Sequence, residues 1–131
     1  MKLLLPALAT VFILDQCSTE DETISGYVEP DRQWYVTSIN DRPFTAEAFI
    51  SFPEEGVIEG SGPCNAFTAK QTLPYPWFKV SDLSGPAQAC TEFQAEQIFR
   101  VRLSLVTQAE VQGGVLILRD DDDIEMVFEA R

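Results

Sequence analysis

The sequence predicts an α+β domain that is mostly antiparallel β, with about seven short strands and one helix between strands five and six. Three observations predict it. Short runs rich in aromatic and β-branched residues recur along the chain, Pro and Gly residues separate them, and one long stretch has helical periodicity. Contiguous short strands joined by turns favour an antiparallel sheet, because a parallel crossover needs a dozen or more connecting residues.

Five strands are expected before the helix. The first, Trp34 to Ile39, is followed by a turn in which Pro43 blocks continuation. The other four follow at short intervals and are bounded by Pro, Gly or charged residues: 48–52, 57–60, 64–71 and 77–80. Two more strands, 115–118 and 124–128, flank an acidic stretch and predict a C-terminal hairpin.

The helix is expected from about Thr91 to Gln108. Thr91 suits the N-cap position, and Glu92 lies in the first turn, where its charge meets the positive end of the helix dipole. Glu96 and Arg100 are expected on the outer side as an i,i+4 ion pair. Apolar residues at three- and four-residue spacing predict the core-facing side: Ala95, Ile98, Phe99, Leu103 and Val106.

The composition excludes several functions. Among 131 residues the net charge is −12 and there is no histidine. An acidic chain is poorly suited to nucleic acid, which requires clustered Lys and Arg, so no nucleic-acid partner is expected. Without histidine, neither a Ser-His-Asp triad nor a His-ligated zinc site can form, and three cysteines are too few for a Cys₄ site. The acidity itself indicates solubility.

The N-terminus has the pattern of a signal peptide. Lys2 precedes an apolar run, Leu3 to Leu14, whose 12 residues are too few to span a bilayer as a helix. Cys17 follows where a bacterial lipoprotein carries its lipid-bearing Cys, although Asp15 and Gln16 occupy positions where small residues are usual. We therefore expect a signal peptide at 1–16, a lipid on Cys17, an acidic tether at 17–32 and a domain at 33–131. An ordinary buried N-terminal helix is the alternative.

Cys64 and Cys90 are the candidate disulfide. Both lie beyond the signal, on the exported side, where thiols oxidise. A bridge over the long intervening loop would stabilise the fold by about 3–4 kcal/mol. Two buried, reduced cysteines packed as small hydrophobes are the alternative. A redox-active pair is not expected, because the Cys-x-x-Cys spacing is absent.

Two groups of acidic residues could in principle form a metal site or a catalytic pair. Asp120 to Asp123 offer oxygen ligands for Ca²⁺, but the alternate spacing, central Gly and distal Glu of an EF-hand loop are absent, so a solvated hairpin tip is expected. Glu92 and Glu96 are four residues apart on the helix. They are expected to provide capping and surface charge rather than a catalytic pair. No catalytic residue, cofactor site or metal site is predicted.

Several motifs together indicate a family. The first strand is led by Trp34, and a second Cys follows a small residue, at Ala89-Cys90. A glycine-rich turn runs into Cys-Asn-x-aromatic: Gly60, Gly62, Cys64, Asn65 and Phe67. The helix carries Glu96, Phe99 and Leu103, and a leucine-rich hairpin, Leu116 to Phe128, ends the chain. From about Gln33 to Ala130 the chain resembles the META-domain family, the HslJ-like envelope proteins of bacteria. Pro63, where the family usually has Gly, is the main departure; 86–88 and Ala69 also differ.

The resemblance implies a curled sheet or open barrel around one helix. It implies a place in the bacterial cell envelope, on the periplasmic side, with the membrane reached through a lipid on Cys17. Some members are associated with heat induction, novobiocin tolerance, or secretion and virulence, and no catalytic residue is established. The expected function is therefore a non-enzymatic, monomeric envelope protein that supports envelope integrity or stress tolerance. A binding module that holds a lipid or other apolar ligand in the curled sheet is the alternative, and a hydrolase using carboxylates is a third reading.

Overall fold

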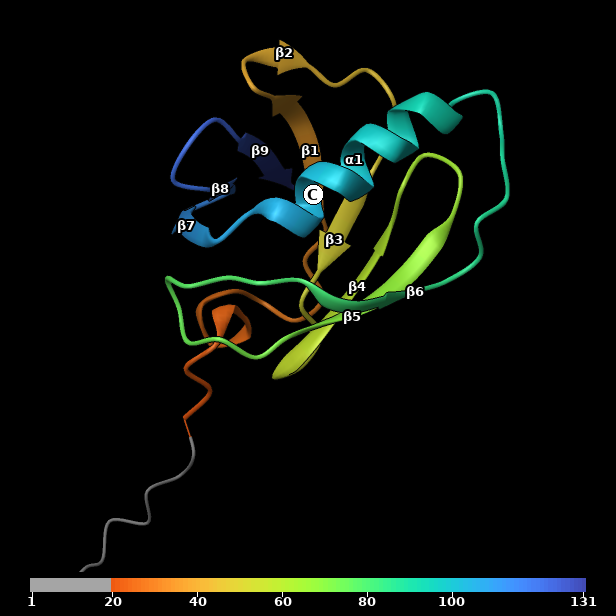
Figure 1. Cartoon of the computed structure of the whole chain (residues 1–131). Coiled ribbons are helices and arrows are strands. Elements are labelled where there is room, and N and C mark those ends of the chain that lie inside the picture. Colours follow the sequence, from red (N-terminus) through yellow and green to blue (C-terminus); the bar gives the residue numbers. More distant parts are fainter. Residues whose placement is uncertain (1–19) are drawn as a thin grey trace, which may run out of the picture.

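The computed structural model describes residues 20–131, and Figure 1 shows a sheet curled around one helix. The expected signal peptide and Cys17 lie outside the described residues. In chain order the elements are η1 (Ile24–Tyr27), β1 (Trp34–Ile39), β2 (Arg42–Pro43), β3 (Phe49–Ser51), β4 (Gly56–Ser61), β5 (Ala66–Gln71), β6 (Ser81–Ser84), α1 (Phe93–Leu105), β7 (Gln108–Gln112), β8 (Val115–Arg119) and β9 (Glu125–Ala130). Within these residues no helix combines the length and apolar character needed to span a membrane.

All strand pairings are antiparallel, in the order β6-β5-β4-β3-β1-β9-β8-β7, with the short β2 paired to β1. The two ends of the domain meet at the centre of the sheet, where β1 runs beside β9 from Trp34↔Ala130 to Ile39↔Met126. A bulge between Val36 and Ser38 shifts the register and increases the local twist. The predicted fold class, mostly antiparallel β with one helix, is confirmed.

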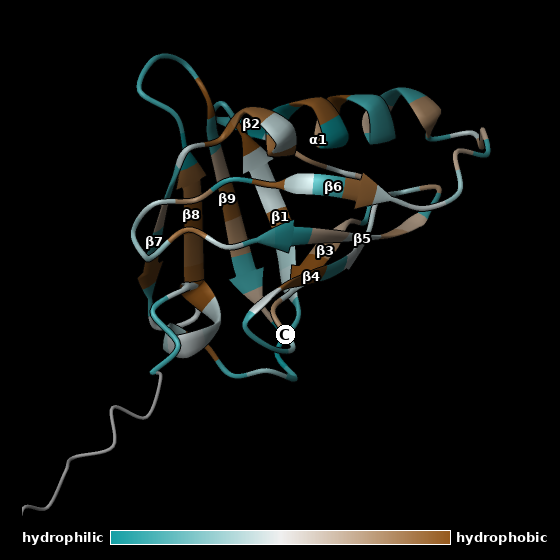
Figure 2. Cartoon of the chain, turned by 60° about the horizontal axis from the view of Figure 1, so that its bottom comes forward, coloured by the Kyte–Doolittle hydropathy of each residue, from teal (hydrophilic) through white to brown (hydrophobic). Residues whose placement is uncertain are grey.

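The core lies between α1 and the concave face of the sheet. In β5 burial alternates strictly, so that Phe67, Ala69 and Gln71 face inward. In Figure 2, β8 is one of the most hydrophobic strands, and its Leu116 and Leu118 are fully buried. Aromatic residues contribute the largest buried side chains: Trp34, Phe52, Phe78, Phe99 and Phe128.

The expected strand at 77–80 is wrong. Gln71 holds this part of the chain as a loop, because its side chain bonds the backbone of Leu73 and Lys79, at 2.9–3.2 Å. The strand comes later, as β6. The loop instead covers the edge of β7, where Phe78 N donates to Thr107 O and Ala109 N donates to Pro76 O. It thereby occupies a sheet edge that would otherwise offer free backbone groups.

The helix is shorter than expected at both ends. It begins at Phe93 after Glu92, with no side-chain cap, so the expected Thr91 cap does not form. It ends at Leu105, because Val106 is extended and buried and Thr107 N already donates to Arg119 O at the start of the β7–β8 pairing.

The acidic stretch before Trp34 contacts the domain closely over its described part. Ile24, in η1, is 1% exposed and belongs to the core. The Asp21 carboxylate accepts hydrogen bonds from Thr23 N, Thr23 Oγ1 and Ser25 Oγ. Burial by itself would raise the pKa of Asp21, but the bonds from Ser25 and Thr23 outweigh it and leave the pKa below its ordinary value. This segment therefore leaves the sheet at a fixed place.

Candidate functional site

The glycine-rich turn, which we call the signature turn, connects β4 to β5 through residues 62–65, with Pro63 and Cys64 at its centre. The turn is closed by Gly62 N, which donates to Asn65 O at 2.9 Å. Pro63 occupies the first central position, where its restricted φ is favourable and its missing N–H is not needed. The amides that matter are those of Cys64 and Asn65, which point away from the hairpin toward α1. Pro63, the main departure from the family pattern, is therefore compatible with the turn.

Glu96 receives those two amides. Its side chain is 0% exposed, and Oε1 accepts from Cys64 N at 3.1 Å and from Asn65 N at 2.7 Å. Oε2 accepts from Asn65 Nδ2. A Cβ on Gly62 would lie 2.6 Å from Glu96 Oε1, so the carboxylate can approach the turn only because residue 62 is glycine.

Asn65 also links the signature turn to the loop between β6 and α1. Asn65 Nδ2 donates to Gln88 O at 2.9 Å, and Gln88 N donates to Asn65 Oδ1 at 3.1 Å. This pair of bonds fixes which way the amide faces. The loop, although it differs from the family pattern at 86–88, is thereby attached to the signature turn.

A disulfide joins Cys64 to Cys90, with the two Cα atoms 5.6 Å apart. The predicted bridge is confirmed, and the reduced, buried alternative is wrong. Cys90 is exposed and Cys64 half-buried, so the bond lies at the surface beside the carboxylate network. We call Cys64, Asn65, Gln88, Cys90 and Glu96 the clamp.

A family model of the META domain matches residues 28–131. The chain belongs to the META-domain family. Two solved structures share the fold, both determined by NMR. The first has a TM-score of 0.61 at 21% sequence identity, and the match covers 78% of this chain and 94% of the chain of that structure. The second, from Burkholderia xenovorans, has a TM-score of 0.62 at 16% sequence identity, and the match covers 86% of this chain and 84% of the chain of that structure. A search of curated proteins finds no significant match.

In this META domain, Glu96 is not the surface residue that helix periodicity predicts. The expected Glu96–Arg100 pair is wrong, because Glu96 turns inward to the clamp; the Nε of Arg100 is buried without a hydrogen-bond partner within residues 20–131. Glu92 is exposed, so the two glutamates differ in environment and do not form a pair. Conversely, Ile98, expected in the core, is 44% exposed. The Glu96 carboxylate already accepts hydrogen bonds from three donors within the domain, so the clamp holds parts of the domain together.

The acidic tip of the β8–β9 hairpin is organised by one residue. Asp120 Oδ1 accepts from the backbone N of Asp122, Asp123 and Ile124, at 2.8–3.1 Å. The bond from Ile124, followed by those from Asp122 and Asp123, holds the pKa of Asp120 below its ordinary value of 3.8. Over the described part of the chain no cluster of three or more Cys, Asp or Glu is arranged to hold a metal ion.

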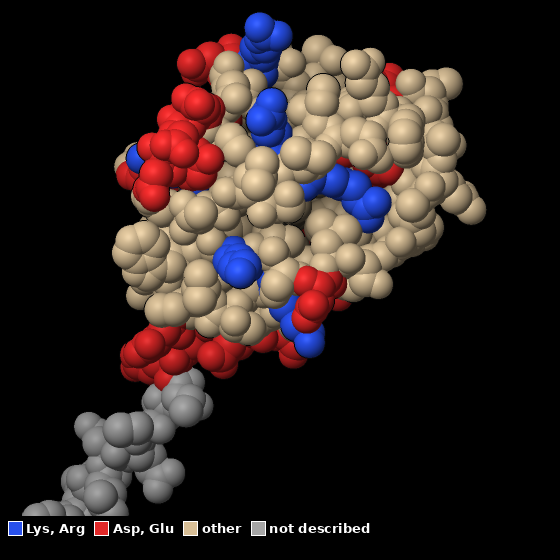
Figure 3. All heavy atoms as spheres, in the orientation of Figure 1, with Lys and Arg blue, Asp and Glu red and all other residues tan. Residues whose placement is uncertain are grey.

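A surface groove of about 540 Å³ lies between α1 and the β1–β2 turn. Apolar and cationic side chains both line it, namely Ile39, Pro43, Phe44 and Ile98 with Arg42 and Arg102. Within residues 20–131 neither arginine forms an ion pair. Figure 3 shows Lys and Arg side chains across this face, with acidic side chains on the same face beside them. The concave side of the sheet, in contrast, is filled by core side chains such as Phe99 and Leu103.

Proposed function

We propose that this META-domain protein is exported, anchored to the bacterial envelope through a lipid on Cys17, and supports envelope integrity or stress tolerance without catalysing a reaction. The observation that carries the proposal is the Cys64–Cys90 disulfide with Cys90 at the surface. A solvent-accessible disulfide persists in an oxidising compartment and is reduced in a cytosol. Export is also what the apolar run before Cys17 predicts.

The geometry of the clamp supports a scaffold role. A general acid or base needs a proton-transfer group that substrate can reach. The Glu96 carboxylate is instead fully buried and accepts bonds from the turn itself. The disulfide and the carboxylate together attach the 85–92 loop and the helix start to the sheet. Such bracing suits a monomer that must stay folded outside the cell's chaperone-rich interior.

Mass spectrometry of the native protein, extracted from its own cells, tests the anchor. We expect a mature N-terminus at Cys17 with a diacylglyceryl group, and the Cys64–Cys90 bridge intact. The matched control is Cys17→Ser, which should leave the membrane fraction while keeping the disulfide. A mature N-terminus elsewhere, or free thiols at 64 and 90 in the freshly isolated protein, contradicts the proposal. Loss of the gene should sensitise cells to envelope stress, and Cys17→Ser should restore tolerance less well than the natural chain.

The groove supports a second candidate, a binding module. We propose a long-chain fatty acid as its ligand, because two arginines that form no ion pair within the described residues line the groove together with apolar side chains. This places the ligand outside the sheet, whereas the alternative named from the sequence places it inside. Native mass spectrometry with oleate should show one bound molecule, lost in an Arg42→Ala, Arg102→Ala double variant and kept in Lys79→Ala. Equal binding by all three proteins contradicts it.

A further inference from the structure

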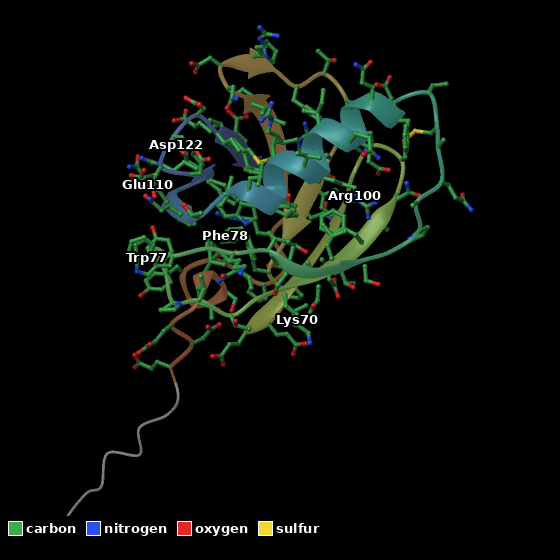
Figure 4. All side chains as sticks on the ribbon, viewed as in Figure 1. Lys70, Trp77, Phe78, Arg100, Glu110 and Asp122 are labelled. Carbon is green, nitrogen blue, oxygen red and sulfur yellow. A yellow bond between two sulfur atoms is a disulfide. The ribbon has the colours of Figure 1, made fainter. Side chains whose placement is uncertain are left out.

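An exposed aromatic surface lies at the end of the molecule where the described chain begins. Tyr27 and Trp77 are each 55% exposed and Leu73 is 38% exposed. Tyr27 stacks on the partly buried Tyr75, with ring centroids 4.4 Å apart. We call Tyr27, Leu73, Tyr75 and Trp77 the aromatic surface. Figure 4 shows Trp77 pointing away from the domain while its neighbour Phe78 points beneath the helix.

This surface is held rigidly. The Tyr75 hydroxyl accepts a bond from Val111 N at 3.0 Å, and Trp77 N donates to Pro74 O at 2.8 Å. The next residue, Phe78, is 1% exposed and anchors the loop in the core. A flexible loop could bury its aromatic residues by folding back, but this one holds Trp77 outward. A fixed, exposed group of large apolar side chains indicates a contact surface.

The aromatic surface is close to the start of the described chain. Tyr75 N donates to Glu22 O at 2.7 Å, which places the loop directly beside the incoming segment. Only three peptide links separate Glu20 from Cys17, and three fully extended residues span at most about 11 Å. The headgroup layer of one leaflet is itself about 5–8 Å thick. A lipid on Cys17 therefore brings this end of the domain against the membrane.

We propose that the aromatic surface lies in the headgroup layer of a zwitterionic membrane and fixes the orientation of the domain; this rests on the proposed anchor at Cys17. Tyr and Trp suit that depth, because their rings are apolar and their O–H and N–H groups remain hydrated. The lipid is zwitterionic rather than anionic, because Glu20 and Glu22 are exposed beside the surface and the chain carries a net charge of −12. Figure 3 shows acidic side chains gathered at the end of the domain where the described chain begins.

Tryptophan fluorescence tests the proposal, because the chain has two tryptophans and only Trp77 is exposed. The native lipidated protein is incorporated into phosphatidylcholine vesicles that carry bromine near the top of the acyl chains. We expect the emission of Trp77 to shift to the blue, to be quenched by the bromolipid and to become protected from acrylamide. Trp77→Phe, which leaves the buried Trp34 alone, should abolish all three effects. Trp77 emission that stays as accessible to acrylamide as in the detergent-free, delipidated protein overturns the proposal.

A second preparation separates this proposal from that of the natural anchor. With Cys64 and Cys90 bridged, Cys17 is the remaining thiol, so a maleimide phospholipid can be coupled to it in the chain from residue 17 onward, which retains the whole described core. Quenching in this conjugate supports the aromatic surface even where native mass spectrometry finds no lipid, an outcome that overturns the anchor alone. Lack of quenching in the conjugate overturns the aromatic surface even where the natural lipid is found.

Two further variants test whether the protection from acrylamide depends on the aromatic surface. Tyr27→Ser with Trp77→Ser should raise acrylamide access to a reporter placed at Leu73, while Val101→Ser should have no effect. Val101 is 50% exposed on α1, and Figure 2 shows the helix at the end opposite η1. Vesicles of phosphatidylglycerol at low salt should protect Trp77 less than phosphatidylcholine does. Equal or greater protection by the anionic lipid contradicts the assignment of a zwitterionic surface.

Discussion

Substitution of Glu96 should unfold this domain more readily than any change at the helix surface. Glu96→Ala removes the acceptor of Asn65 N and Asn65 Nδ2, which are buried, and of Cys64 N, which is half-buried. A buried donor left without a partner costs about 1–3 kcal/mol. Water can reach Cys64 more easily than Asn65, so we expect a total loss of about 3–5 kcal/mol. That is a large share of the roughly 5–15 kcal/mol by which domains are stable.

Glu96→Gln gives an intermediate result with a structural reason. The amide oxygen can still accept from the two backbone N–H groups, but its NH₂ group then faces the Asn65 NH₂. Asn65 cannot simply rotate, because its Oδ1 accepts from Gln88 N and its Nδ2 donates to Gln88 O. One buried bond is therefore lost, and we expect a decrease of about 1–2 kcal/mol.

Guanidinium denaturation, followed by tryptophan fluorescence in a Trp77→Phe background so that the emission comes from the core residue Trp34, measures this series with the disulfide intact. The matched control is Glu92→Gln, one helical turn earlier, whose side chain is exposed and which should stay within about 0.5 kcal/mol of the natural protein. The reasoning is refuted if Glu96→Ala lowers the free energy of unfolding by less than about 1 kcal/mol, or if Glu92→Gln lowers it as much.

Three other predictions follow from single contacts. Gly62→Ala should destabilise by about 1–3 kcal/mol, because its Cβ would lie 2.6 Å from Glu96 Oε1; Gly114→Ala, with no atom within 4 Å, is the control, and equal thermal midpoints contradict the steric argument. Cys64→Ser with Cys90→Ser should cost about 3–4 kcal/mol in chemical denaturation, from the sequence separation of 26; an unchanged midpoint on adding reductant to the natural protein would show that the bridge contributes nothing. The lowered pKa of Asp120 means that its contribution is complete above the ordinary value of 3.8 and disappears as pH falls through the lower folded value. The amide of Ile124 should therefore lose hydrogen-exchange protection on acidification below that range. Asp120→Asn should weaken this protection already at neutral pH, whereas Asp122→Asn should not. Protection that changes neither with pH nor in Asp120→Asn argues against the assigned turn.

The aromatic and β-branched runs predicted most of the sheet because alternation is a local property. β1, β3, β4, β5, β8 and β9 lie close to their expected ranges. The errors came where a tertiary contact decides. The segment 77–80 is as rich in β-forming residues as any strand, yet Gln71 and the edge of β7 hold it as a loop. The end of the helix, likewise, is set by the pairing of Thr107 with Arg119.

The residues and their spacing were enough to predict the family, most of the strand pattern, a candidate cysteine pair and the absence of histidine chemistry. These depend on which residues are present and on their spacing, and both are visible in the chain. The roles of Glu96 and Trp77 became visible only in the folded domain. Helix periodicity assigns Glu96 to the solvent side. The carboxylate turns inward because Gly62 leaves room for it and because the backbone amides of Cys64 and Asn65 donate to it. Likewise, Trp77 and Phe78 are adjacent aromatic residues of the predicted 77–80 strand, and the contact with β7 decides which one faces out. Burial depends on neighbours distant in the sequence, and local spacing does not specify them.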